Sequence, residues 1–197
     1  MTNRPPLRAD ARRNRGHVLA VAAEAFATEG LSVPVHEIAR RAGVGTGTVS
    51  RHFPAKEDLY AAVLRARIEE LAAEADLLAQ REEPGAAFFR FVAVVVRAGA
   101  AHRGLAEQLA ATAGDPGAQH ERMALDVLSD RTDSLLEGAQ KAGAVRADVA
   151  LADVQSLMAA CMGRGDGPAL EPLIAVVNDG LRAGECGRSL RPLTARP

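Results

Sequence analysis

The 197-residue chain is 48% apolar and 25% charged, a balance that excludes a disordered chain and allows one large or two small domains. Aromatic residues make up 3% and tryptophan is absent, so the core must consist mainly of Leu, Val and Ala. The net charge of −1 hides an asymmetry, because residues 1–56 hold nine Lys and Arg against four acids. No stretch shows sustained strand alternation. We therefore expect an all-α protein with a basic N-terminal part suited to nucleic acid.

Several features argue against secretion, a membrane span and metal chemistry. The N-terminal residues 1–15 are charged where the apolar region of a signal peptide should begin, and the longest apolar run, 91–96, is too short to cross a bilayer. The two cysteines, Cys161 and Cys186, provide neither a disulfide framework nor metal-ligand spacing. We expect a cytoplasmic protein with no membrane contact, no metal and no cofactor.

The first helix is predicted over residues 9–28, and Gly30 closes it. Val18, Ala25 and Phe26 lie on its apolar face. Its first turns carry three arginines, where cations oppose the helix dipole, so a phosphate contact and an ordinary charged surface are equally compatible with them. These arginines are Arg12, Arg13 and Arg15.

Residues 35–56 have the pattern of a helix, a tight turn, a second helix and the start of a third. Gly43 lies where the first helix must stop and reverse, because glycine takes a positive φ without steric cost. The apolar positions that hold the pair together are Ile38, Ala39, Ala42, Val44, Val49 and Phe53. This is the packing pattern of a helix-turn-helix.

The second helix of this pair presents short polar side chains and a guanidinium, which suit base edges in a major groove. Lys56 follows in the first turn of the next helix, where free backbone N–H groups favour an anion, and its alternative is a solvated lysine. The predicted DNA-binding residues are Thr46, Gly47, Thr48, Ser50, Arg51, His52 and Lys56.

The run VxxIARRAGVGTGTVSRHFPAKEDL resembles the DNA-binding domain of the tetracycline-repressor (TetR) family of bacterial transcriptional regulators, and the likeness extends over residues 12–64. Two positions depart from the family pattern. Ser50 stands where relatives often have Tyr, and Pro34 stands where they often have a Ser or Thr cap. The resemblance implies a helix-turn-helix domain over residues 9–54 and a helical effector-binding and dimerisation domain over 55–184, with about nine helices in all.

The fourth helix is predicted to end near residue 80. The fifth helix is predicted to span residues 86–101. Tyr60, the only tyrosine, is expected to pack beside Phe26 or Phe53 rather than to act in catalysis. The fifth helix is apolar around nearly its whole circumference, so it should occupy the middle of the body and either line a pocket or form core. The predicted effector-binding residues are Phe88, Phe91, Val95 and Met123.

A short sixth helix is predicted over residues 105–112 and a seventh over 119–141. His102, His120 and Glu121 do not have metal-ligand spacing on one helix, so we interpret them as polar surface groups.

The last two helices each carry two apolar stripes, and only one stripe per helix can face the body. The resemblance implies that these helices pair with their copies in a second subunit as a four-helix bundle. Leu157, Ala160, Leu173 and Val176 form the second stripes. The predicted interface residues are Val154, Met158, Leu170, Ile174, Val177 and Leu181.

The leading interpretation is a homodimeric regulator, a repressor released from a palindromic operator in double-stranded DNA by a small apolar or aromatic effector. Its two recognition helices would lie ~34–36 Å apart in successive major grooves. Two alternatives are open: a ligand-blind dimer whose body only dimerises, and a DNA-processing enzyme that carries a helix-turn-helix. The enzyme is disfavoured because no nucleophile, base and charge-stabilising group come together in the sequence.

Overall fold

The computed structural model describes residues 6–105, 107, 118–165 and 167–184, and the side chains in these ranges except those of 6–12 and 118–121. In this part of the chain there are eight helices and no strand, which confirms the all-α prediction. The sixth predicted helix, the side chains of Arg12, His120 and Glu121, and Cys186 lie largely or wholly outside the described residues. The helices are α1 (Pro6–Glu29), α2 (Val35–Arg41), α3 (Thr46–His52), α4 (Lys56–Arg81), α5 (Pro84–Ala101), α7 (Ala118–Lys141), α8 (Leu151–Met162) and α9 (Leu170–Leu181).

Local chemistry sets several helix ends. Gly30 and Gly43 have φ of +81° and +65°, so both predicted glycine turns are present. After α2 the Val44 N–H donates to the Ala39 carbonyl at 3.0 Å, the long closing bond of a Schellman turn. At the start of α4 the Asp58 carboxylate accepts from the Ala55 N–H at 2.8 Å. These interactions are all short-range, which explains why the sequence predicts these boundaries well.

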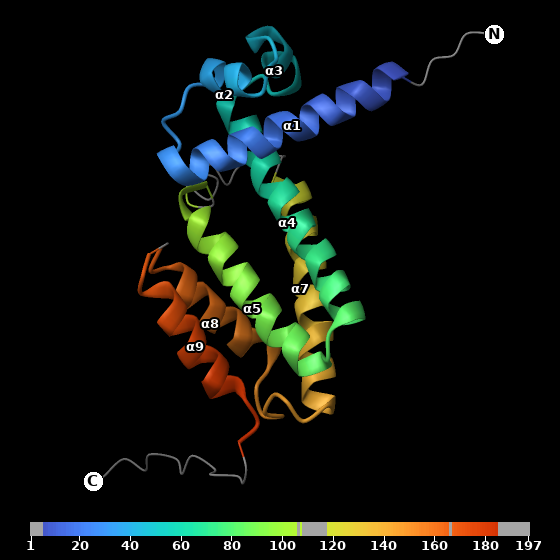
Figure 1. Ribbon diagram of the computed structural model, residues 1–197, viewed down its shortest axis with the longest axis vertical. Helices are drawn as coiled ribbons and strands as arrows, with labels where there is room; N and C mark the ends of the chain where they lie inside the picture. Colours follow the sequence, from blue (N-terminus) through green and yellow to red (C-terminus); the bar gives the residue numbers. More distant parts are fainter. Residues whose placement is uncertain (1–5, 106, 108–117, 166, 185–197) are drawn as a thin grey trace, which may run out of the picture.

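Two hydrophobic cores organise the molecule, and α4 belongs to both. The first core joins α1–α3 to the beginning of α4, and we call this unit the head; the second, which we call the body, is built around α5. Figure 1 shows the head at one end of the molecule and α4 running from it along the body. Leu105, after α5, is 2% exposed and packs in the head core. The head and body are therefore joined both by α4 and by the segment after α5.

α5 is the central helix of the body, as its apolar circumference predicts. It packs against α4 and α7 on one side and against α8 and α9 on the other (Figure 1). By length and composition alone α5 could cross a membrane, but 56% of that stretch is buried inside the protein, as is usual for a core helix. Phe88 and Phe91 have no exposed surface, and Val95 is also buried. These three side chains lie in the body core, and their contact with an effector stays a prediction.

The packing of α8 and α9 differs from the predicted interface. Val177 is half-buried, and the other five predicted interface residues are buried in the core of their own subunit. They are Val154, Met158, Leu170, Ile174 and Leu181. The second stripe faces outward instead, with Leu157 38% exposed and Val176 68% exposed. Among the described residues, Leu157 and Val176 are the large apolar side chains that α8 and α9 leave exposed.

Candidate nucleic-acid interface

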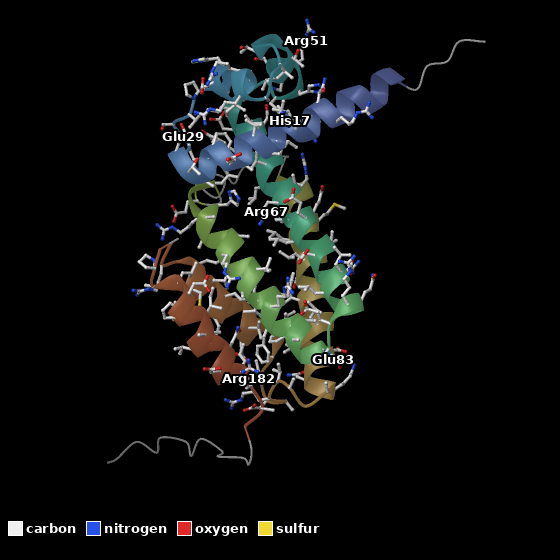
Figure 2. All side chains as sticks on the ribbon, viewed as in Figure 1. His17, Glu29, Arg51, Arg67, Glu83 and Arg182 are labelled. Atoms are coloured by element: carbon white, nitrogen blue, oxygen red, sulfur yellow. The ribbon has the colours of Figure 1, made fainter. Side chains whose placement is uncertain are left out.

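The outer face of α3 is polar and its inner face is apolar. Val49 is completely buried in the head core, which fixes the rotation of this short helix. The rest of the helix surface exposes Thr46, Gly47, Ser50, Arg51 and His52, while Thr48 is half-buried. Figure 2 shows Arg51 at the end of the molecule farthest from the body. Five of the six α3 residues predicted to contact DNA are thus exposed.

Arg40 and Arg41 of α2 are held in ion pairs within the head. Arg40 donates two bonds to the Glu37 carboxylate at 2.7 and 2.8 Å, and Arg41 bonds both Glu37 and Glu29. Hydrogen bonds from Arg40 and Arg41 lower the pKa of the Glu37 carboxyl to about 2, so this acid is ionised at neutral pH. Within the described residues no ion pair engages Arg51. Arg51 is therefore the better placed of the three to meet an external anion or base.

Lys56 has a partner inside the protein. Its ammonium and the Tyr60 hydroxyl both donate to the Leu31 carbonyl, at 2.5 and 2.7 Å, which ties α4 to the loop before α2. The Tyr60 ring packs edge-on against Phe26 with centroids 5.0 Å apart, so the predicted packing of the lone tyrosine is confirmed. An ammonium has three donors, so the bond to Leu31 leaves others for a phosphate. The phosphate role of Lys56 stays a prediction.

Tyr60→Phe should lower the free energy of unfolding by about 0.5–1.5 kcal/mol, because it removes one hydrogen bond from Leu31 and keeps the ring against Phe26. Urea denaturation followed by circular dichroism measures the change. In this variant the Leu31 carbonyl still accepts a hydrogen bond from Lys56. A loss of unfolding free energy above about 3 kcal/mol would therefore contradict the assignment of a single hydrogen bond to the Tyr60 hydroxyl.

The first helix also packs on the end of the recognition helix. The Arg15 guanidinium lies over the Phe53 ring, 5.3 Å from its centroid, at the point where α3 ends. A basic side chain of α1 is thus close to the exposed end of α3. Arg15 is therefore placed beside the predicted DNA surface.

Comparison with known proteins agrees with this architecture. Residues 18–63 match the bacterial regulatory proteins of the tetR family, and residues 83–183 match the C-terminal domain of SbtR-like transcriptional regulators. The chain belongs to the TetR family. A TetR regulator from Mycobacterium vanbaalenii is 44% identical, with a TM-score of 0.75 over 90% of this chain and 99% of that one.

Two further TetR-family structures are similar at lower identity. A regulator from Streptomyces coelicolor is 29% identical, with a TM-score of 0.73 over 87% of this chain and 99% of that one. The ketosteroid regulator KstR2 of Mycobacterium tuberculosis shares the fold at 21% identity, with a TM-score of 0.56 over 85% and 94% of the two chains. No curated protein matches the chain. The protein is thus a transcriptional regulator with a helix-turn-helix DNA-binding head.

In this TetR-family body the predicted effector residues do not meet. Phe88, Phe91 and Val95 are in the core, whereas Met123 is 59% exposed on α7. Met123 instead lines an open groove of about 500 Å³ between α4 and α7. A second open site of about 470 Å³, which we call the cavity, lies between α4, α5 and α9 and contains Arg67 and His102.

Sequence reasoning missed Arg67 and treated His102 as a helix-end or surface group. A signal for Arg67 was present, because it lies four residues after buried Val63 and four before buried Leu71. That spacing places it on the inward stripe of α4, where a charged residue requires an explanation.

Proposed function

We propose that the protein is a homodimeric, ligand-responsive repressor that binds a palindromic operator through α3. The observation that carries this proposal is the outer face of α3, where Ser50, Arg51 and His52 are exposed above buried Val49. Short hydroxyls, an imidazole and an unpaired guanidinium are donors and acceptors that can read base edges in a major groove. A DNA-binding role supports a cytoplasmic location.

Dimerisation through α8 and α9 supplies the two-fold symmetry that a palindrome requires. The surface of these helices includes Leu157 and Val176, with half-buried Leu173 and Val177 beside them. Two helices from each subunit would form a four-helix bundle and bury these side chains. TetR-family regulators function as dimers, which supports this arrangement.

The route from body to head runs through α4 and the segment after α5. Leu59 and Val63 of α4 lie in the head core, and Leu71 and Leu78 lie in the body core. A ligand that binds one arrangement of the body more tightly would shift the position of the heads, and it can do so only by its differential affinity for the two states. By linkage, operator DNA must then weaken ligand binding by the same factor.

A ligand-blind dimer is the second candidate, because Phe88, Phe91 and Val95 are buried in the body core. A DNA-processing enzyme has less support. Within the described residues there is no group of three metal-binding side chains, and the Tyr60 hydroxyl is bonded to a backbone carbonyl. We therefore propose no catalytic activity.

Arg51→Ala should weaken operator binding by about 1–3 kcal/mol, if the guanidinium makes a bidentate base contact. The operator is first obtained by sequencing genomic fragments retained by the purified protein, and affinities are then measured by fluorescence anisotropy. Lys56→Ala should instead weaken all duplexes similarly and reduce the salt slope by about one.

Arg81→Ala is the matched control, because it removes the same charge from an exposed position at the far end of α4. Its operator affinity should stay close to that of the wild type. Unchanged binding by Arg51→Ala would remove α3 from the proposed interface. Equal, sequence-independent losses for Arg51→Ala and Lys56→Ala would make Arg51 a phosphate contact.

A further inference from the structure

The cavity between α4, α5 and α9 combines apolar walls with an unusual set of charged groups. Val94, Ala98 and Leu170 provide apolar surface, and Arg67, Arg97, His102 and Glu171 provide polar groups. The cavity volume is about 470 Å³, within the range of small-molecule sites. Figure 2 places Arg67 at the end of the body nearest α1. This site is separate from the groove that contains Met123.

Arg67 provides a hydrogen-bond donor with no acceptor. Its Nη1 donates to Glu70 at 2.8 Å, but its Nε is buried and has no acceptor among the described residues. A buried N–H without an acceptor carries an energetic cost, which is larger when the group is charged. The Arg67 side chain as a whole is 38% exposed, so its guanidinium reaches solvent at one edge while Nε is shielded and has no acceptor among the described residues.

The other charged groups of the cavity do not satisfy Arg67. Arg97 donates to both carboxylate oxygens of Glu171, at 2.6 and 2.7 Å, so this pair is closed on itself. His102 is half-buried, and burial, followed by the nearby Arg67 charge, lowers the pKa of its imidazole. A histidine that is less readily protonated can still donate one N–H. Among the described residues that line the cavity, donors are therefore in excess, and the one carboxylate, that of Glu171, is already engaged.

We propose that this cavity binds a small amphipathic carboxylate. Its carboxylate would accept hydrogen bonds from Arg67 and His102, and its hydrocarbon part would lie along Val94, Ala98 and Leu170. A guanidinium and a carboxylate form short, strong, charge-assisted bonds, and the planar fork of arginine suits the two oxygens. This deepens the proposed function, since such a compound would be the effector class. It replaces the purely apolar effector predicted from the sequence.

Glu70 provides a specific internal check on this assignment. Its carboxylate occupies one donor of Arg67 and repels an incoming anion. Glu70→Gln removes that negative charge and should tighten carboxylate binding severalfold. Arg67→Met keeps an unbranched side chain on the inward stripe and should weaken carboxylate binding by about tenfold or more. Arg65→Met is the matched control, because Arg65 lies on the same helix but lines the α4–α7 groove.

The test is isothermal titration of the full-length protein with octanoate, hexanoate and benzoate, each against its neutral amide, with inorganic phosphate as a further arm. We expect at least one carboxylate to bind and its amide to bind about tenfold more weakly. Failure of all three carboxylates to bind, or equal affinity for acid and amide, overturns the proposal. So does a larger loss for Arg65→Met than for Arg67→Met, which would move the site to the other groove.

Phosphate binding as strong as that of the best carboxylate would also overturn the proposal, by showing a general anion site. Failure of the carboxylate proposal can be distinguished from failure of the proposed function, because these titrations contain no DNA. If the unliganded protein does not bind operator DNA, the repressor proposal is refuted, whereas the proposed carboxylate site is unaffected by that result. Carboxylate binding that leaves operator affinity unchanged would refute only the effector role.

Discussion

Phe91→Ala should lower the free energy of unfolding by about 3–5 kcal/mol. The Phe91 side chain has no exposed surface and lies in the body core. α5 packs against α4, α7, α8 and α9, so truncation opens a space that the surrounding helices can close only in part. Guanidinium denaturation followed by circular dichroism measures the change in midpoint and slope.

Arg90→Ala is the control on the neighbouring position. Its guanidinium is 62% exposed and pairs with Glu82 on the surface, so its removal should change the unfolding free energy by less than about 0.5 kcal/mol. The experiment also separates the two roles considered for Phe91. A variant that keeps wild-type stability but loses ligand binding would return Phe91 to the wall of an effector pocket.

The head could be predicted almost completely from the sequence because local rules determine it. The turn at Gly43 requires a positive φ, and the spacing of Ile38, Ala39 and Val49 fixes which faces of α2 and α3 are buried. Once those faces are fixed, Ser50 and Arg51 must point outward. Each of these deductions depends on residues within one or two turns of each other.

The body was predicted less well because its decisive contacts are distant in sequence. On α8 and α9 both stripes are apolar, so periodicity alone could not show that Val154 and Ile174 face inward while Val176 faces outward. The ion pair of Arg97 and Glu171 joins residues 74 positions apart. An arginine with an unsatisfied donor, as at Arg67, becomes visible only when every neighbouring acceptor is known.

The exposed stripe of α8 and α9 leads to the last prediction. Val176→Asp should convert the proposed dimer to a monomer, because a two-fold interface through α9 would bury two unpaired carboxylates, each at a cost of several kcal/mol. We expect the dimer dissociation constant to rise by at least about 100-fold. The subunit should stay folded, since Val176 is 68% exposed and lies outside the body core. Light scattering over a range of concentrations measures the mass, and circular dichroism checks the helix content.

Leu125→Asp is the matched control for Val176→Asp. Leu125 is an exposed apolar residue of α7, 50% exposed, and α7 packs against the side of α5 opposite α8 and α9 (Figure 1). This variant should stay dimeric and keep its operator affinity, whereas monomeric Val176→Asp should lose the cooperative contribution of the second half-site. A dimer that survives Val176→Asp but separates with Leu125→Asp would place the subunit interface on α7. In that case the heads would be held by a different pair of helices, and the spacing of α3 in the two subunits would have to be derived again from that contact.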